Sequence, residues 1–151
     1  MNHPEAWTRI KEVAERRRDA SARVLADMMR RANAAQQQLI LLREYRLDYG
    51  TRLQHASRDG VGSGCLRNYQ KFLANLEEAI TLQIGTIASL EQAVAQARRE
   101  VNGEQRRAES YRIIDDRRSS EASVRERRRA QGLQDEMAIR VVAQSVANGE
   151  S

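Results

Sequence analysis

Two long heptad patterns meet at a single break, and this arrangement constrains the fold more than any other feature of the sequence. On both sides of SRDGVGSG, residues 57–64, apolar residues recur at alternating steps of three and four. That spacing is typical of a helix that packs along another helix. The break holds three of the chain's eight glycines. The sequence therefore predicts two helices joined by a short glycine-bearing loop.

The heptad patterns also predict the seam, meaning the line of residues on each helix that faces the other helix. In the first helix two successive steps of four after Val24 indicate a stutter, a local unwinding of the supercoil. The predicted seam of the first helix is Ile10, Val13, Ala20, Val24, Met28, Ala32, Ala35, Leu39, Leu42, Arg46, Tyr49 and Leu53. The predicted seam of the second helix is Leu66, Tyr69, Leu73, Leu76, Ile80, Gln83, Ile87, Leu90, Val94, Ala97, Val101, Glu104, Ala108 and Tyr111.

The predicted fold is all-α, a long antiparallel two-helix coiled-coil hairpin that forms a single domain over residues 1–151. Gly60 suits the left-handed conformation that ends a helix, and Ser63 suits a helix cap. The expected ranges are helix one at about 5–56, the turn at about 57–64, and helix two from about 65 to 115 or further.

The same pairing leaves the end of the chain without a partner. Counting outward from the turn places Leu53 opposite Leu66 and Ile10 opposite about residue 110. Helix one therefore provides no partner beyond about residue 115. Residues 116–151 are rich in arginine and lack a seam, so we expect an overhang that is partly disordered, because isolated helices are marginal in water.

The net charge and the cysteine content indicate a cellular compartment but do not identify a partner. A net charge of +5 is compatible with nucleic acid, acidic lipid or acidic proteins. Cys65 is the single cysteine, so no internal disulfide is possible and a reducing compartment fits. We find no signal peptide and no apolar run of about 18 residues, and we expect a soluble cytosolic protein.

No pattern in the sequence points to catalysis. A two-helix hairpin does not form the concave site that an enzyme needs. His3 and His55 are far apart, and no Cys/His cluster suggests a metal. The stretch GVGSG lacks the Lys-Ser/Thr of a phosphate-binding loop. We therefore predict no catalytic residues, no metal, no cofactor and no small-molecule substrate.

The stretch LILLREYRLDY, residues 39–49, is apolar on more sides than one partner helix can bury. Tyr45 lies beside the predicted seam, and Phe72 and Ala79 flank the seam of the second helix. An apolar face of this width suggests a protein-binding surface or self-association. The alternative is thicker packing by side chains that lie along the hairpin.

Arginines cluster at 16–18, 117–118 and 127–129. A solvated coiled-coil flank is the common explanation, and arginines also pair well with carboxylates on a facing protein. Nucleic-acid binding is the other possibility, but no aromatic residues alternate with the basic ones.

The stretch NYQKFLANLEEAI, residues 68–80, resembles the FliJ family of flagellar export proteins, and the resemblance extends over most of the chain. The residues that fit the family's pattern are Tyr69, Gln70, Phe72, Leu76, Glu77, Ala79 and Ile80. Gln83 stands where the best-known pattern has histidine, and Leu66 stands where some members have tryptophan.

The resemblance implies a coiled coil similar to the stalk subunit of rotary ATPases. Such proteins insert into the export ATPase hexamer, contact the cytoplasmic part of the membrane export gate, and escort export chaperones. It also implies a cytoplasmic location, peripheral to the inner membrane at the flagellar basal body. The end with both termini would enter the ATPase ring, and Arg16, Arg17 and Arg18 would contact it. The family's gate-binding patch matches Gln38, Leu42, Tyr45, Tyr49, Phe72, Leu76 and Ala79.

Two alternatives stay open at this point. The chain could be the equivalent stalk of a virulence type III secretion system. It could instead be an arginine-rich coiled coil that binds nucleic acid.

Overall fold

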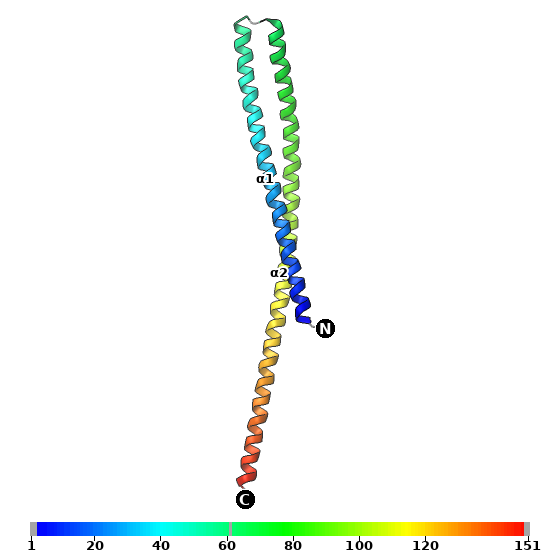
Figure 1. Cartoon of the computed structure of the whole chain (residues 1–151), viewed down its shortest axis with the longest axis vertical. Helices are drawn as coiled ribbons and strands as arrows, with labels where there is room; N and C mark the ends of the chain where they lie inside the picture. Colours follow the sequence, from blue (N-terminus) through cyan, green and yellow to red (C-terminus); the bar gives the residue numbers. More distant parts are fainter. Residues whose placement is uncertain (1–2, 61, 150–151) are drawn as a thin grey trace. The chain divides into compact units, whose positions relative to one another are not determined.

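The computed structural model describes residues 3–60 and 62–149, which contain two helices, and the predicted all-α antiparallel hairpin is confirmed. Helix α1 is His3–Arg58 and helix α2 is Ser63–Gly149 (Figure 1). By packing, the chain divides into two compact units, which are described separately. The turn unit is Arg16–Gln105. The terminal unit joins the residues of α1 through Glu15 to the residues of α2 from Arg106 onward.

The turn is built as the glycines predict, with one difference at the start of α2. Gly60 has a φ of 72°, in the left-handed region that favours glycine. The Leu66 N–H donates to the Gly62 carbonyl at 3.3 Å, so Gly62 and not Ser63 precedes the first helical residue. Residue 61 of the predicted turn lies outside the described residues.

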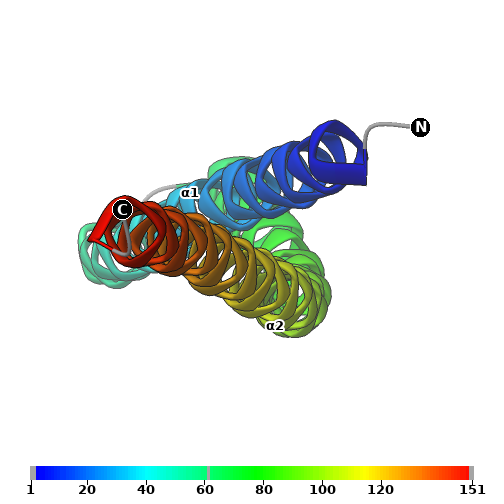
Figure 2. The same cartoon turned by 90° about the horizontal axis from the view of Figure 1, so that it is seen from below.

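In the turn unit the two helices lie side by side and run antiparallel (Figure 1; Figure 2 gives the view along the helices). The predicted seam of α2 is confirmed, because all its positions are buried or half-buried. The residues of this seam with the least exposure are Leu76, Ile80, Ile87, Ala97 and Val101 in the turn unit and Ala108 in the terminal unit.

The seam of α1 is confirmed only from Met28 onward. Ile10, Val13 and Val24 are all more than two-fifths exposed, and Ala20 is exposed as well. The prediction was wrong there because it followed the apolar residues. The inward positions of this part of α1 are Trp7, Lys11 and Ala14 in the terminal unit and Arg18, Ser21 and Leu25 in the turn unit.

These inward positions continue the steps of three and four from Met28, so the predicted stutter is also wrong. The packed half of α1 sets the phase of the helix, and a polar residue that falls on the seam stays there. Long basic side chains tolerate such positions because the stem packs while the charged end reaches water.

In the terminal unit a few contacts join the start of α1 to α2. The rings of Trp7 and Tyr111 lie 6.3 Å apart, and Lys11 Nζ lies 3.4 Å from Asp115 Oδ2. The Arg118 guanidinium lies over the Trp7 ring, 4.3 Å from its centroid. The pairing agrees with the predicted position near residue 110, although Ile10 itself faces solvent.

Surface pairs along the helices contribute little to stability. Arg112 Nε donates to Glu109 Oε2 at 3.1 Å, and this hydrogen bond lowers the pKa of Glu109 and raises the pKa of Arg112. Both side chains are exposed, so the pair stabilises one turn of α2 rather than the hairpin.

Beyond the pairing with α1, every described residue of α2 from Arg125 to Gly149 is exposed. The segment is helical, and the partial disorder expected for residues 116–151 stays a prediction. Residues 150 and 151 lie outside the described part. Neither described helix is both long and apolar enough to cross a membrane.

Candidate functional site

An aromatic cluster lies beside the turn. The rings of Tyr49 and Phe72 are 4.3 Å apart and inclined at 39°, and the ring of Tyr69 is 6.3 Å from that of Tyr49. The Arg52 guanidinium lies 5.3 Å from the Tyr49 ring centroid. Tyr49 thus joins both helices and receives ring contacts from α2 and a cation–π contact from its own helix.

An exposed apolar surface continues from this cluster along one side of the hairpin. Residues four and seven apart share a helix face, which places Tyr45, Leu41 and Gln38 on the side of α1 next to Tyr49. On α2, Ala79 follows Phe72 by the same rule. We call this the apolar surface, made of Gln38, Leu41, Tyr45 and Tyr49 on α1 and Phe72 and Ala79 on α2.

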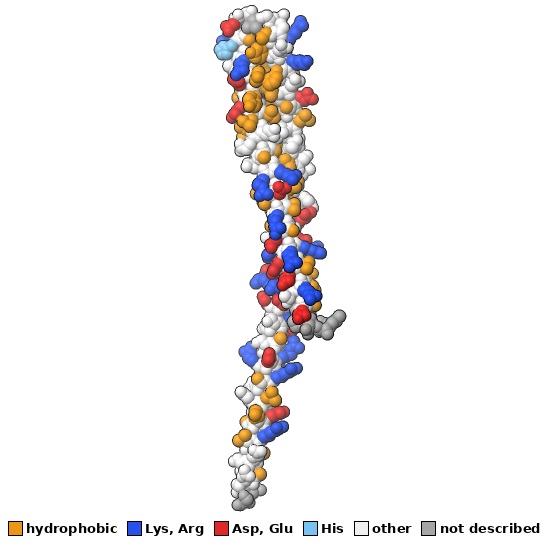
Figure 3. Space-filling view, in the orientation of Figure 1, with side chains coloured by type: hydrophobic (Ala, Val, Ile, Leu, Met, Phe, Trp, Pro, Cys, Tyr) orange, Lys and Arg blue, Asp and Glu red, His pale blue; other side chains and the backbone are white. Residues whose placement is uncertain are grey.

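Tyr49 and Ala79 are half-buried and the other four residues of the apolar surface are exposed, so one partner helix does not bury this surface. Tyr45 is 54% exposed, Leu41 is 52% exposed and Phe72 is 41% exposed. Figure 3 shows hydrophobic side chains gathered on this part of the hairpin, next to the turn. The predicted excess of apolar surface over the needs of the seam is therefore confirmed.

The predicted gate-binding residues fall into two groups, those of the apolar surface and those of the seam. Leu76 is only 8% exposed and Leu42 is half-buried, so both support the hairpin from within. Leu41 was not among the predicted site residues. The signal that identifies it is its spacing of four residues from Tyr45.

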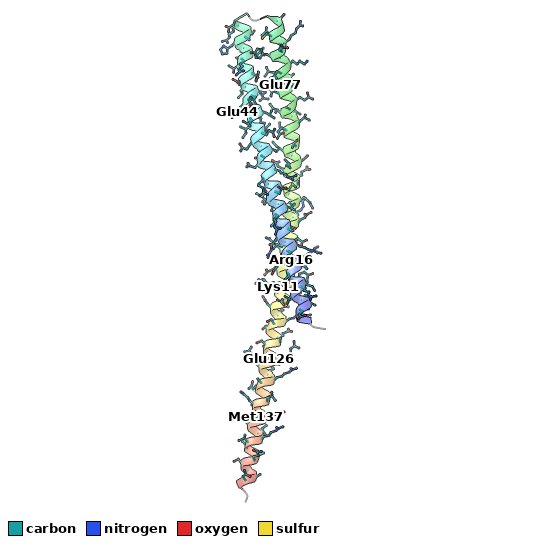
Figure 4. All side chains as sticks on the ribbon, in the orientation of Figure 1. Lys11, Arg16, Glu44, Glu77, Glu126 and Met137 are labelled. Atoms are coloured by element: carbon teal, nitrogen blue, oxygen red, sulfur yellow. The ribbon has the colours of Figure 1, made fainter. Side chains whose placement is uncertain are left out.

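Charged residues border the apolar surface. Glu44 on α1 and Glu77 on α2 lie along the same part of the hairpin (Figure 4) and are exposed. An apolar centre with a charged border is the usual composition of a protein–protein interface. The arrangement suits the binding of another protein.

The predicted ring-binding arginines lie elsewhere in the turn unit. Arg16 and Arg17 are exposed, whereas Arg18 is half-buried at an inward position. Arg18 Nε donates to Asp19 Oδ1 at 3.3 Å. Along α1, Arg16 and Arg17 are roughly 40 Å from Tyr45 at 1.5 Å per residue, so the structure does not bring the two predicted sites together.

Nothing in the described ranges suggests a metal centre, since they contain no group of three or more His, Cys, Asp and Glu residues placed to hold an ion. Cys65 is exposed next to the turn.

Comparison with known proteins identifies one family over most of the chain. A family model described as "Flagellar FliJ protein" matches residues 6–147. The chain is 30% identical over 131 residues to a flagellar FliJ protein of Salmonella typhi, covering 87% of this chain and 89% of that protein. It is also 30% identical over 135 residues to a flagellar FliJ protein of Escherichia coli strain K12, covering 89% and 92% of the two chains.

The family match spans both helices and the turn between them, so it covers the apolar surface and the arginines of α1 alike. A helical hairpin with this extent of similarity places the chain in the FliJ family of flagellar proteins.

Proposed function

We propose that the chain is a non-enzymatic stalk and adaptor of the flagellar type III protein export apparatus. It inserts into the export ATPase hexamer, contacts the cytoplasmic part of the membrane export gate, and escorts export chaperones. It works in the cytoplasm, held by these partners at the inner membrane beneath the flagellar basal body. Membership of a flagellar family supports the export role.

The observation that carries the proposal is the apolar surface beside the turn. Leu41, Tyr45 and Phe72 together present more apolar area than a monomeric hairpin needs to expose. Aromatic residues with apolar neighbours and a charged border are typical anchors of protein–protein binding. We assign this surface to the export gate, with Tyr45 and Leu41 as direct contacts and Leu42 and Leu76 as support.

The arginines at 16–18 suit a different partner. Arg16 and Arg17 are exposed side by side on α1, and guanidinium groups form bidentate pairs with carboxylates. We assign them to acidic residues of the ATPase ring. Arg18 contributes less, since it points inward and bonds Asp19.

The first prediction tests the apolar surface with two leucines on the same helix. Leu41→Ala should weaken binding to the purified cytoplasmic domain of the export gate by about 1–3 kcal/mol, as should Tyr45→Ala. Leu47→Ala should change it by less than about 0.5 kcal/mol, although Leu47 is 69% exposed. Leu47 is two residues from Tyr45 and therefore faces another side of α1. Isothermal titration calorimetry gives the three affinities.

Binding to the ATPase hexamer is the internal control of this experiment. Leu41→Ala and Tyr45→Ala should leave it unchanged, and Arg16→Gln with Arg17→Gln should weaken it in a salt-dependent way. Circular dichroism first establishes that each variant remains helical. Equal gate affinities for Leu41→Ala and Leu47→Ala would reject the apolar surface as the gate contact.

A further inference from the structure

In the terminal unit the seam spacing of α2 continues beyond the level at which α1 begins. The buried or half-buried positions of α2 in this unit are Ala108, Tyr111, Ile114, Asp115 and Val124. Of these, Ala108, Tyr111 and Asp115 continue the seam spacing of the turn unit. The same steps of three and four then give Arg118, Ala122, Arg125 and Arg129. The seam therefore changes from small and aromatic side chains to basic ones at the level of Trp7.

A groove follows these positions. One hollow of about 750 Å³ is lined by Trp7 and Thr8 of α1 and by residues of α2 that include Arg118, Ala122 and Arg125. A second hollow of about 550 Å³ is lined by Ala122, Arg125, Glu126, Arg129, Ala130 and Leu133. The two hollows share Ala122 and Arg125 and therefore adjoin along one face of α2, and the second lies on α2 alone. We call these two adjoining hollows the seam groove.

The seam groove begins where α1 ends its pairing with α2, which makes it the continuation of an established helix–helix interface. Trp7 lies at its mouth, held by Arg118 at 4.3 Å and by Tyr111 at 6.3 Å. Small and apolar residues, Ala122, Ala130 and Leu133, lie among the arginines along it. This spacing suits another α-helix, because helices contact each other at steps of three and four.

The charges along the seam groove determine which kind of helix could bind there. Three arginines occupy its central positions, whereas Glu121 and Glu126 lie on its two sides. Asp115 is already paired with Lys11 at 3.4 Å. A second copy of this segment laid parallel and in register would set arginine against arginine at positions 118, 125 and 129, and like charges at facing positions destabilise a coiled coil.

We propose that the seam groove binds an acidic amphipathic helix of a partner protein, which takes the place that α1 would occupy if its pairing with α2 continued past Trp7. Glutamates or aspartates at seam spacing on that helix face Arg118, Arg125 and Arg129, and small residues between them pack on Ala122 and Ala130. Guanidinium–carboxylate pairs in such a setting give orientation as well as affinity. This site shares no residue with the apolar surface or with Arg16 and Arg17, and it stands without the proposed export role.

The chain offers a local reporter for this proposal, because Trp7 is its single tryptophan. The probe is a synthetic helical peptide of about three heptads without tryptophan, with glutamate and alanine alternating at the seam positions. Added to the full-length protein, it should bind with salt-dependent affinity and shift the fluorescence of Trp7. A peptide of the same composition in scrambled order should do neither.

Two pairs of substitutions that remove the same charge distinguish binding in the seam groove from general attraction to a basic segment. Arg125→Gln with Arg129→Gln should weaken the peptide about tenfold or more. Arg117→Gln with Arg127→Gln removes the same charge from the same segment. Both residues are exposed, and neither is three or four residues from Arg118, Arg125 or Arg129, so they lie off the seam. This pair should leave the affinity within about threefold. Charge reversal adds a gain of function, since Arg125→Glu with Arg129→Glu should bind a lysine version of the peptide.

Equal loss in both glutamine pairs would overturn the proposal in favour of diffuse attraction. Concentration-dependent dimers in sedimentation that dissociate on Arg125→Gln with Arg129→Gln would show that a second copy fills the groove. A Trp7 shift produced by vesicles of anionic phospholipid, but not by the peptide, would assign the segment to a membrane surface. Failure of the reversed pair to bind the lysine peptide, with helicity retained, would also overturn it.

Discussion

One polar residue inside the seam illustrates what single side chains do in this fold. Gln83 Nε2 donates to the Ala35 carbonyl of the other helix at 2.9 Å. Ala35 is 7% exposed and Gln83 is half-buried, so the bond is partly buried between the two helices. A polar residue at a seam position gives up hydrophobic stabilisation, and in return its hydrogen bond forms in one alignment of the helices only.

The second prediction concerns this bond. Gln83→Ala should lower the free energy of unfolding by about 1 kcal/mol, because it removes a partly buried hydrogen bond and its packing. Gln70→Ala, at an exposed position of α2, should change it by less than about 0.5 kcal/mol. Urea denaturation followed by circular dichroism measures both. Equal effects would mean that the bond does not contribute in solution.

Phe72 packs within the hairpin and also exposes surface that a partner could contact, so a substitution by alanine would affect both. Its ring lies against Tyr49, and 41% of the residue still faces solvent. Phe72→Ala would therefore loosen the hairpin and remove partner surface together. Tyr45 and Leu41 are the cleaner probes of binding, because each leaves more than half of its surface in solvent.

At the scale of the element, helix α1 keeps one heptad phase even where its sequence offers a different apolar stripe. Val24 fits the apolar spacing of the sequence, yet it is 48% exposed, whereas the adjacent Leu25 is half-buried. A helix is stiff, so the well-packed half from Met28 to Leu53 sets the direction in which the preceding turns face. The polar residues Lys11, Arg18 and Ser21 then fall on the seam.

The third prediction tests which heptad phase of α1 faces α2, the one that includes Val24 or the one that includes Leu25. Leu25→Ala should cost about 1–2 kcal/mol of stability, less than a fully buried leucine because the site is only half-buried. Val24→Ala should cost less than about 0.5 kcal/mol. Thermal melts of the two variants give the comparison. A larger loss for Val24→Ala would support the stutter and contradict the continuous heptad phase.

At the scale of the whole molecule, the chain distributes its candidate contacts over two units. The turn unit carries the apolar surface and the exposed arginines of α1, and the terminal unit carries the seam groove. The two helices that form the hairpin also supply every one of these surfaces, because a hairpin without a third layer leaves most side chains exposed. Its candidate binding sites are therefore helix faces rather than enclosed cavities.

The fourth prediction tests the hairpin itself in solution. Leu53→Cys and Leu66→Cys, with Cys65→Ser, should form a disulfide within one chain, because both leucines are half-buried seam positions on opposite sides of the turn. Non-reducing electrophoresis separates monomers from dimers, and mass spectrometry identifies the linked peptides. Links found only between chains would replace the intramolecular hairpin with an assembly of two copies. A pair with Cys at Leu53 and at exposed Arg67 is the matched control and should link less efficiently.

The sequence by itself determined the two helices, the turn and the whole seam of α2. Each follows from local chemistry: the steps of three and four, the single cluster of glycines, and the left-handed conformation of Gly60. It also predicted that residues 39–49 expose apolar surface, because four consecutive apolar residues cannot all face one neighbour.

The tertiary structure decided which stripe of α1 faces α2, since that depends on the packing of the partner helix and not on the apolar residues of α1 alone. It decided that Phe72 stacks on Tyr49 and that Gln83 bonds Ala35. It also placed Trp7 beneath Arg118 at the mouth of a basic groove. These pairs join residues far apart in the chain, and only the register of two antiparallel helices brings them together.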